Sequence, residues 1–282
     1  MPPIVRPAEE ADYTALSRFL NSSIHLHRHL DWRDSLEWLS RQPFLLMEED
    51  DRITAALSCV AEPEEVAWVR LFAAALRSSP DRAWSKLFEP ALETLRSTAN
   101  PPAIVSLVLR EWYEDMLKRK GFTHHQDIIV FLFDQDPPPA PKIDPSFKIR
   151  EMGEKDLHAV AEVDHLAFEP IWRLSLADLG FAQARSSYCT VLEIEGRVIG
   201  YTMSSSTGMY AHLARLAVHP DFLGQRLGYG LVQDLLDHFI SGLNYWGVTL
   251  NTQHDNHASL ALYHKVGFRE TGERFPVYMY RY

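Results

Sequence analysis

The second half of the chain shows the clearest alternation of apolar and polar positions. Two β-rich runs between residues 187 and 204 are joined by Glu-Gly, which predicts a hairpin. Residues 209–218 predict a third strand, which ends before Pro220. From residue 228 to 240 the apolar side chains recur at helical spacing, so a helix is expected soon after that strand.

The remaining elements of this half complete an α/β (α+β) pattern. We expect further strands at 147–151, 246–251, 268–271 and 277–282, and helices at 154–168 and 258–265. Gly267 is placed to end the last helix. This order of elements predicts a mixed, mostly antiparallel sheet with helices on both faces.

The first half repeats this order in a weaker form. We expect strands at 4–6, 44–47, 53–60, 66–74, 103–109 and 127–133, and helices at 11–20, 31–40, 80–96 and 111–120. The intervals from Arg52 to Arg197 and from Gly121 to Gly267 are nearly equal, and each pair occupies matching positions in a predicted element. Two landmarks at nearly the same interval indicate a duplicated domain.

A proline-rich stretch separates the two halves. Five of the 17 prolines lie between Asp134 and Pro145, which predicts an extended, semi-rigid linker. Of the 13 glycines only Gly121 precedes this stretch. We therefore divide the chain into a domain at 1–135, a linker at 136–146 and a domain at 147–282, and only the last domain is equipped for a glycine-rich loop.

Composition and charge exclude several classes of protein. Hydrophobic residues make up 46% and charged residues 23%, as in ordinary globular proteins. No stretch approaches the ~20 apolar residues of a membrane span, and no signal peptide is evident, so a cytoplasmic protein is expected. The net charge of −10 argues against nucleic-acid and membrane partners. Cys59 and Cys189 match no metal-ligand spacing, so we expect reduced thiols and no metal.

The most informative run extends from Arg215 to residue 232. A predicted strand is followed by a glycine-rich loop and an amphipathic helix, whose free N–H groups and dipole favour an anion. Gly228 and Gly230 would let the backbone approach a diphosphate, and Arg226 adds positive charge. The run lacks the Lys-Ser/Thr of a P-loop and the spacing of a dinucleotide fingerprint. Simple turn formation is the alternative explanation of these glycines.

Two motifs resemble those of the GNAT superfamily of N-acetyltransferases. Gln225-Arg-Leu-Gly-Tyr-Gly230 is similar to its Q/R-x-x-G-x-G/A signature, and residues 216–220 resemble the strand before it. Residues 256–268 resemble the second motif, N-x-x-A-x-x-L-Y-x-x-x-G-F. The match covers about 147–282, whereas the first half resembles the fold only in its order of elements. The resemblance implies two tandem GNAT-like domains, the first of them degenerate.

The resemblance also implies a donor site for acetyl-CoA in the second domain. The pantetheine arm would add to the backbone of Leu216, Ala217 and Val218, and Asn256 would hydrogen-bond the arm. The diphosphate would lie on backbone N–H groups of the loop and helix start: Gly224, Gln225, Arg226, Leu227, Gly228, Tyr229 and Gly230.

The chemistry implied by the resemblance is direct transfer to a primary amine. A neutral amine would attack the thioester, and the backbone N–H of Val218 or a neighbour would stabilise the oxyanion. Tyr263 would protonate the departing thiolate. Residues 167–187, which include Phe168 and Trp172, would shape the acceptor pocket.

The general base departs from the common family pattern. Many members carry a glutamate at the position of Asn251, and an amide cannot act as a base. His212, six residues before Val218, is the candidate base, and a hydrogen-bonded sheet histidine is the alternative. His254 and Asp255 lie near the strand end and are further candidates.

The first half lacks the glycine loop, and Pro80 removes one N–H from its helix start, so we expect a structural or acceptor-shaping role. Its run of His25, His27 and His29 favours a solvated loop or helix start over a metal site. For the whole chain we expect an acyl-CoA-dependent N-acetyltransferase acting on a small-molecule or peptide amine. A non-catalytic acyl-CoA-binding regulator or sensor and a structural interaction protein are the alternatives.

Overall fold

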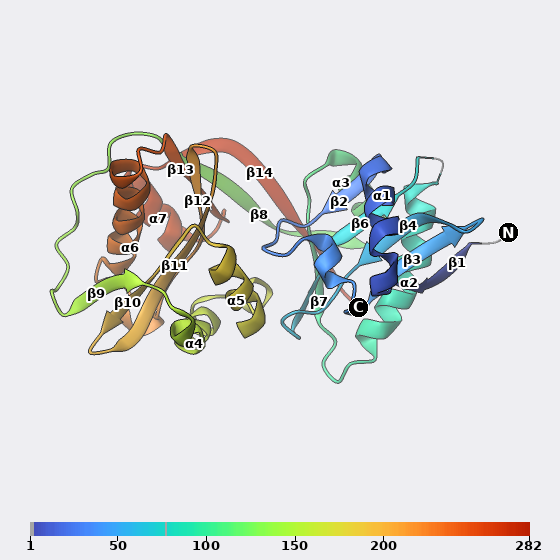
Figure 1. The fold of residues 1–282 in the computed structure, drawn as a ribbon, viewed down its shortest axis with the longest axis horizontal. Coiled ribbons are helices and arrows are strands. Elements are labelled where there is room, and N and C mark those ends of the chain that lie inside the picture. The colour runs from blue at the N-terminus through green and yellow to red at the C-terminus, as the bar shows by residue number, and fades with distance from the viewer. Residues whose placement is uncertain (1–2, 77) are drawn as a thin grey trace. The chain divides into compact units, whose positions relative to one another are not determined.

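The computed structural model describes residues 3–76 and 78–282, which form two compact units (Figure 1). Unit 1 comprises Met1–Gln126 and Phe275–Tyr282, and unit 2 comprises Asp127–Arg274. The chain passes from one unit to the other inside two long strands, β8 (Phe122–Phe133) and β14 (Arg269–Tyr280). Each unit therefore contains a strand segment from the other half of the sequence.

Unit 2 is a mixed α/β unit. Its elements follow in the order β9 (Phe147–Glu151), α4 (Leu157–Ala167), α5 (Leu176–Arg185), β10 (Tyr188–Ile194), β11 (Arg197–Thr207), β12 (Tyr210–Val218), α6 (Leu227–Leu236), β13 (Gly247–Gln253) and α7 (His257–Val266). The sheet order is β14-β8-β13-β12-β11-β10-β9. Strands β12 and β13 are parallel, whereas the pairs from β12 to β9 and the pair β13/β8 are antiparallel. The predicted mixed, mostly antiparallel sheet is confirmed.

Most of the helices and strands predicted for this half are present, because short stretches of sequence determine them. Helix α7 ends at Gly267, whose φ of 112° requires the left-handed conformation that glycine adopts freely. Two expectations are wrong or incomplete. The strands expected at 268–271 and 277–282 are parts of the single strand β14, and helix α5 was not predicted.

Unit 1 has the same class of architecture. Its elements are β1 (Ile4–Pro7), α1 (Tyr13–Ser22), β2 (His25–Arg28), β3 (Phe44–Glu49), β4 (Arg52–Ser58), β5 (Val66–Trp68), β6 (Leu71–Ala74), α2 (Pro80–Arg96), β7 (Ala103–Leu107) and α3 (Glu111–Arg119). One sheet has the order β1-β3-β4-β6-β2. Beside it, β5 pairs in parallel with β7, and β7 pairs antiparallel with the end of β14.

Three expectations for this half are wrong. The strand expected at 66–74 is divided into β5 and β6, which pair with different neighbours. Residues 31–40 contain only a 3₁₀ turn, Ser35–Trp38, and no α-helix. Of the histidines expected in a solvated loop or helix start, His25 and His27 belong to β2, and His29 follows directly after it. His27 is only 3% exposed, because β2 pairs with β6 and its side chains pack on aromatic rings.

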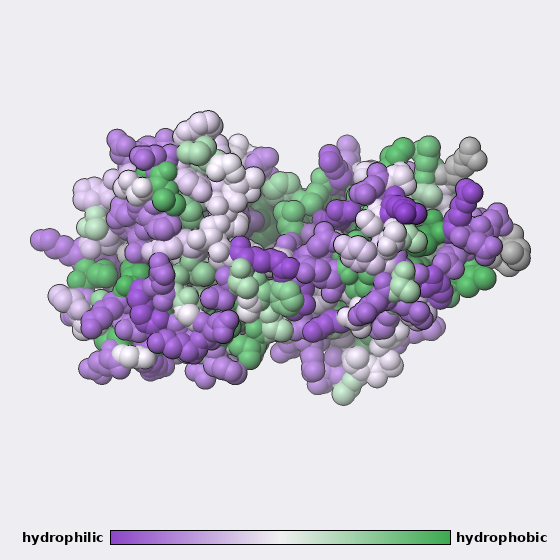
Figure 2. All heavy atoms as spheres, in the orientation of Figure 1, coloured by the Kyte–Doolittle hydropathy of each residue, from purple (hydrophilic) through white to green (hydrophobic). Residues whose placement is uncertain are grey.

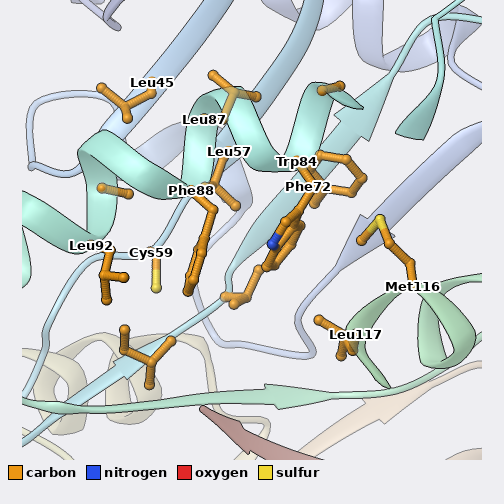
Figure 3. Packing of buried hydrophobic residues seen from close by; sticks show 14 of the residues in the cluster. Leu45, Leu57, Cys59, Phe72, Trp84, Leu87, Phe88, Leu92, Met116 and Leu117 are labelled. Carbon is orange, nitrogen blue, oxygen red and sulfur yellow. The ribbon is translucent and has the colours of Figure 1, made fainter. Parts of the chain in front are cut away.

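The core of unit 1 lies between α2 and the sheet (Figure 3). The apolar face of α2 presents Trp84, Leu87 and Phe88 to strands β3, β4 and β6. The rings of Phe72 and Trp84 meet edge to face with centroids 5.1 Å apart. Leu117 of α3 closes one end of the same cluster. Unit 1 therefore has a hydrophobic core of its own.

A repeated ion pair supports the duplication of the two units. Arg6 on β1 contacts Asp12 at 2.7 Å, and Arg150 on β9 contacts Asp156 at 2.7 Å. Each aspartate also accepts a backbone N–H three residues before it, and each arginine also pairs with a glutamate on the neighbouring strand. The same contacts recur at intervals of 144 residues, or 145 for the glutamates, which agrees with the tandem arrangement.

The face drawn in Figure 2 is largely polar, with apolar side chains between the polar ones. Exposed large apolar residues include Leu76, Leu223 and Trp246. Within residues 3–76 and 78–282, no helix is long and apolar enough to cross a membrane.

Candidate functional site

The candidate site of unit 2 begins where β12 diverges from β13. The parallel pairing extends from Tyr210 opposite Gly247 to Leu213 opposite Leu250. Strand β12 continues to pair with β11 as far as Val218. Residues 214–218 therefore have β11 on one edge, and none of the described strands pairs with their other edge.

A β-bulge lies at the point of divergence. Met203 of β11 is paired with Arg215, whereas the next residue, Ser204, is paired with Leu213. Ala214 is therefore the extra residue on β12. A bulge reverses which backbone groups face which edge, and the sequence pattern gave no sign of it.

The bulge determines which backbone groups reach the open edge. The N–H of His219 donates to the carbonyl of Ile199 at 2.7 Å, so the backbone of His219 faces β11. Successive residues of a strand direct their N–H and C=O groups to opposite edges. Val218 and Leu216 consequently face the open edge, and Ala217 faces β11. Of the three residues predicted to pair with the arm, Leu216 and Val218 direct their backbone groups to the open edge, and Ala217 does not.

Helix α6 begins directly beyond this edge with an uncapped end. Arg226 is its N-cap in the left-handed region, with φ of 62°, and no side chain caps the helix there. Gly224 in the preceding loop has φ of 80°. The N–H groups of residues 227–229 have no intrahelical acceptor in a helix that starts here. The N–H of Gly230 instead donates to the carbonyl of Arg226 at 3.0 Å and is already used.

Packing accounts for the two helical glycines. A Cβ atom on Gly228 would lie 3.2 Å from Leu262 of α7, and one on Gly230 would lie 3.5 Å from Ile143. Gly228 therefore allows α6 to approach α7, and Gly230 allows the proline-rich segment to cover α6. The loop glycine that the backbone conformation itself requires is Gly224.

Asn256 caps helix α7. Its side-chain oxygen accepts the N–H of Ser259 at 3.1 Å, and its amide nitrogen donates to Gln253 at 3.4 Å. An amide nitrogen carries two hydrogens, so one of them is still available to a ligand. The cap is a structural reason for an asparagine at this position, in addition to the predicted contact with a cofactor arm.

Tyr263 of α7 is 6% exposed and lies in the core of unit 2. Its ring centroid is 6.0 Å from that of Phe131 and 5.8 Å from that of Phe268. Burial raises the pKa of Tyr263 to about 12, and a hydrogen bond with Ser259 opposes the shift. The phenol is therefore protonated at neutral pH, so it can donate a hydrogen bond or act as an acid.

His212 lies on β12 before the bulge and is held by a neighbouring strand. Its Nδ1 is 2.9 Å from the hydroxyl of Thr249, and that hydroxyl donates to the carbonyl of Ala211 at 3.3 Å. The hydroxyl proton is thus used, so Nδ1–H donates to Thr249, and Nε2 carries the lone pair. Burial lowers the pKa of His212 below its ordinary value of 6.5, which keeps the ring neutral at pH 7.

The other candidate bases are placed less suitably. Asn251 is exposed on β13, opposite Val130 of β8. His254 accepts the backbone N–H of Asp127 through Nδ1 at 3.2 Å, which fixes the turn after β13. Asp255 is exposed in that turn.

A buried ionic cluster that sequence reasoning missed lies next to the bulge. Arg215 donates to Asp164 of α4 at 2.6 Å, to the hydroxyl of Tyr201 at 3.0 Å and to the carbonyl of Trp172 at 2.6 Å. Asp164 is fully buried and also accepts the Tyr201 hydroxyl. The guanidinium covers the ring of Phe168 at 3.9 Å. The cluster holds the segment 168–172 against β12. In the sequence, the charged Arg215 within the predicted strand was the feature that could have indicated this cluster.

The described residues contain no group of three or more His, Cys, Asp or Glu side chains placed to hold a metal. Cys59 and Cys189 are both free, and burial raises the pKa of each thiol, that of Cys59 to about 12. Neither thiol is activated as a nucleophile.

Unit 2 thus combines a mixed sheet, two diverging central strands and a glycine-rich helix start. A family model described as the acetyltransferase (GNAT) family matches residues 157–268. An uncharacterized N-acetyltransferase of Methanocaldococcus jannaschii is 31% identical over 122 residues, which are 43% of this chain and 78% of that protein. The chain belongs to the GNAT acetyltransferase family.

Solved structures show the same fold over the whole chain. A tandem GNAT protein from the clavulanic acid biosynthesis pathway superposes with a TM-score of 0.66 at 14% identity and covers 98% of each chain. A GNAT protein from Sphaerobacter thermophilus gives 0.62 at 16% identity, covering 98% of this chain and 95% of that one. These identities are low and describe the fold alone, which is two tandem GNAT-like units.

Proposed function

We propose that unit 2 is an acyl-CoA-dependent N-acyltransferase that transfers acetyl from acetyl-CoA to a primary amine. The observation that carries this proposal is the open edge of β12 at Leu216 and Val218, directly before the uncapped start of α6. An extended, amide-bearing arm adds to such an edge as a further strand does. The helix start beyond it supplies N–H groups and a positive dipole end to a diphosphate.

The donor site in this proposal uses six consecutive backbone positions, residues 224–229. Gly230 is left out because its N–H is used within the helix. Arg226 is exposed at the N-cap and adds charge beside the diphosphate. In this proposal the remaining amide hydrogen of Asn256 donates to the arm. Residues 147–282 supply this chemistry, 136–146 link the halves, and 1–135 form a degenerate copy.

Acetyl-CoA supplies an activated thioester, which a neutral amine attacks directly. A backbone N–H on the open edge, that of Val218 or Leu216, donates to the oxygen that becomes negatively charged. This donor is fixed by the pairing of β12 with β11, so it does not reorganise during the reaction.

Two side chains handle protons in this proposal. His212 is neutral at pH 7 and accepts a proton from the attacking amine at Nε2, directly or through water. Tyr263 donates a hydrogen bond to the departing thiolate. A phenol with a pKa of about 12 is a weaker acid than a thiol with a pKa of about 8.5, so the hydrogen bond stabilises the thiolate and solvent completes its protonation.

An acceptor screen tests the proposal. The full chain is incubated with acetyl-CoA and a panel of small amines, amino acids and peptides, and products are detected by a mass gain of one acetyl group and release of free thiol. We expect acetylation of at least one class of amine. Binding of acetyl-CoA without any product would instead support the alternative of a regulator or sensor, which the exposed amide of Asn251 favours.

A further inference from the structure

Unit 1 contains its own version of the divergence seen in β12. Strand β5 pairs in parallel with β7, as the first part of β12 pairs with β13. Strand β6 then pairs antiparallel with β4, as the second part of β12 pairs with β11. Val69 and Arg70, between β5 and β6, correspond to the region of Ala214 in unit 2. The edge of β6 away from β4 is therefore the counterpart of the open edge of β12.

In unit 1 this edge is filled by a segment of the same chain. Strand β2 pairs antiparallel with β6, from His25 opposite Ala74 to Arg28 opposite Leu71. The N–H of His29 continues the ladder and donates to the carbonyl of Arg70 at 3.0 Å. Strand β6 thus has β4 on one edge and β2 on the other.

The side chains of this segment fill the space between β6 and α3. Alternate histidines stack on aromatic rings, with centroid distances of 5.1 Å for His25 and Trp112, 4.1 Å for His27 and Tyr113, and 4.6 Å for His29 and Trp68. Trp112 and Tyr113 belong to α3, the counterpart of α7, which carries Asn256 and Tyr263 in unit 2.

One hydrogen bond and the charge state of the histidines fit a buried segment. The ring Nε2–H of His27 donates to the carbonyl of Val69 at 3.0 Å, at the divergence itself. Burial lowers the pKa of His27 and of His29 to about 3, with smaller contributions from His29 and Arg70 respectively. Both rings are therefore neutral and introduce no charge into the core.

The helix that follows β6 is closed to an anion as well. At the start of α2 the hydroxyl of Ser79 accepts the N–H of Arg82 at 3.4 Å, and Pro80 has no N–H. The corresponding helix of unit 2, α6, has neither a side-chain cap nor a proline in its first turn. In unit 1 both the strand edge and the helix start are closed to a ligand, whereas in unit 2 both are open.

We propose that His25–Arg28 is a built-in occupant of the donor groove of unit 1 and takes the backbone edge to which the arm of acyl-CoA adds in unit 2. The comparison with the arm rests on the proposed function of unit 2. The chain accordingly holds one acyl-CoA, and unit 1 keeps both edges of its diverging strand paired without any ligand.

Residue-resolved amide hydrogen exchange of the full chain, with and without acetyl-CoA, tests this inference. Phe72 and Ala74 on β6 face β2 by alternation from Arg70, and their matched controls are Leu216 and Val218 on β12. In the free protein we expect the two β6 amides to exchange roughly 100-fold more slowly than the two β12 amides. Acetyl-CoA should slow the β12 amides and leave those of β6 unchanged.

The outcomes separate the inference from the function on which it rests. Fast exchange of Phe72 and Ala74 in the free protein, or slowing of both by acetyl-CoA, would overturn the built-in occupant. If acetyl-CoA slows neither strand, the donor site of unit 2 is refuted. Slow exchange of the β6 amides in that same experiment would still support the pairing of β2 in the groove.

Discussion

The hydroxyl of Tyr263 is the side-chain group most directly tied to the proposed chemistry. Tyr263→Phe keeps the buried ring and its contacts with Phe131 and Phe268, so stability should change little. Loss of the hydrogen bond to the departing thiolate should lower kcat by about 10²-fold, the low end for acid catalysis, because the raised pKa disfavours full proton transfer. The affinity for acetyl-CoA should stay the same.

A matched tyrosine provides the control for this measurement. Tyr245 packs against the same core beside Phe239, and Tyr245→Phe should leave kcat unaltered. Normal turnover of the Tyr263→Phe enzyme would mean that Tyr263 only packs and that solvent alone serves the leaving group.

Arg215 is expected to matter for stability through the charge it balances. Arg215→Met would leave Asp164 fully buried without its cation, at a cost of about 3–5 kcal/mol in the free energy of unfolding. The double variant Asp164→Asn/Arg215→Met should recover part of that loss because no uncompensated charge is buried. Denaturant unfolding of the three proteins measures both effects, and a double variant no more stable than Arg215→Met would contradict this explanation.

Single residues were predictable where a motif fixes them locally. Leu216 and Val218 were identified from the run that precedes the glycine loop, and the structure directs their backbone to the open edge. Ala217 was grouped with them, but the bulge at Ala214 turns its backbone to β11. A bulge depends on the partner strand, so hydrophobic periodicity along one strand does not reveal it.

At the scale of elements, the uncapped start of α6 is the feature to test. Arg226→Glu reverses the charge beside the proposed diphosphate without touching the core, whereas a side chain at position 228 would press on Leu262. We expect the Kd for acetyl-CoA to rise at least tenfold, about 1.4 kcal/mol, measured by calorimetric titration. Arg226→Gln should show a smaller loss.

The fold of the Arg226→Glu variant should remain intact. A carboxylate at a helix N-terminus interacts favourably with the helix dipole, so Tm should not fall. Unchanged affinity for acetyl-CoA in a folded variant would exclude the helix start from the donor site.

Helices and strands were predictable where nearby residues mark their ends. They were not predictable where a strand forms only by pairing with a segment far away in the sequence. The helices α2 and α7 have proline or asparagine at their starts, and arginine or glycine at their ends. Strand β2 carries no clear strand pattern, because its histidines are buried by pairing with β6 and by stacking on α3. The joining of 268–271 with 277–282 into β14 likewise depends on strands far away in the sequence.

At the scale of the whole molecule, the two halves of the sequence exchange strand segments. Phe131 and Phe133 of β8 are buried in the core of unit 2, although they precede the proline-rich segment. Val277 and Tyr278 of β14 are buried in unit 1, although they follow unit 2 in the sequence. Burial of each large apolar side chain contributes roughly 1.5–3 kcal/mol, so neither half completes its core alone.

A cut in the proline-rich segment should therefore leave the molecule together. A specific protease site is introduced within 137–141, on the N-terminal side of Ile143, which lies beside Gly230. After cleavage we expect the protein to elute as one species in size-exclusion chromatography. The same site left uncleaved is the control. Separation of the two fragments under native conditions would contradict the strand exchange.

The central claim is that the tandem chain has one donor site, in unit 2. Calorimetric titration of the full chain with acetyl-CoA tests it most directly, because the stoichiometry counts the sites. The open edge of β12 and the β2-filled edge of β6 predict about one equivalent bound per chain. Two equivalents would show that unit 1 also binds acetyl-CoA, and no binding would refute the assignment of the donor site.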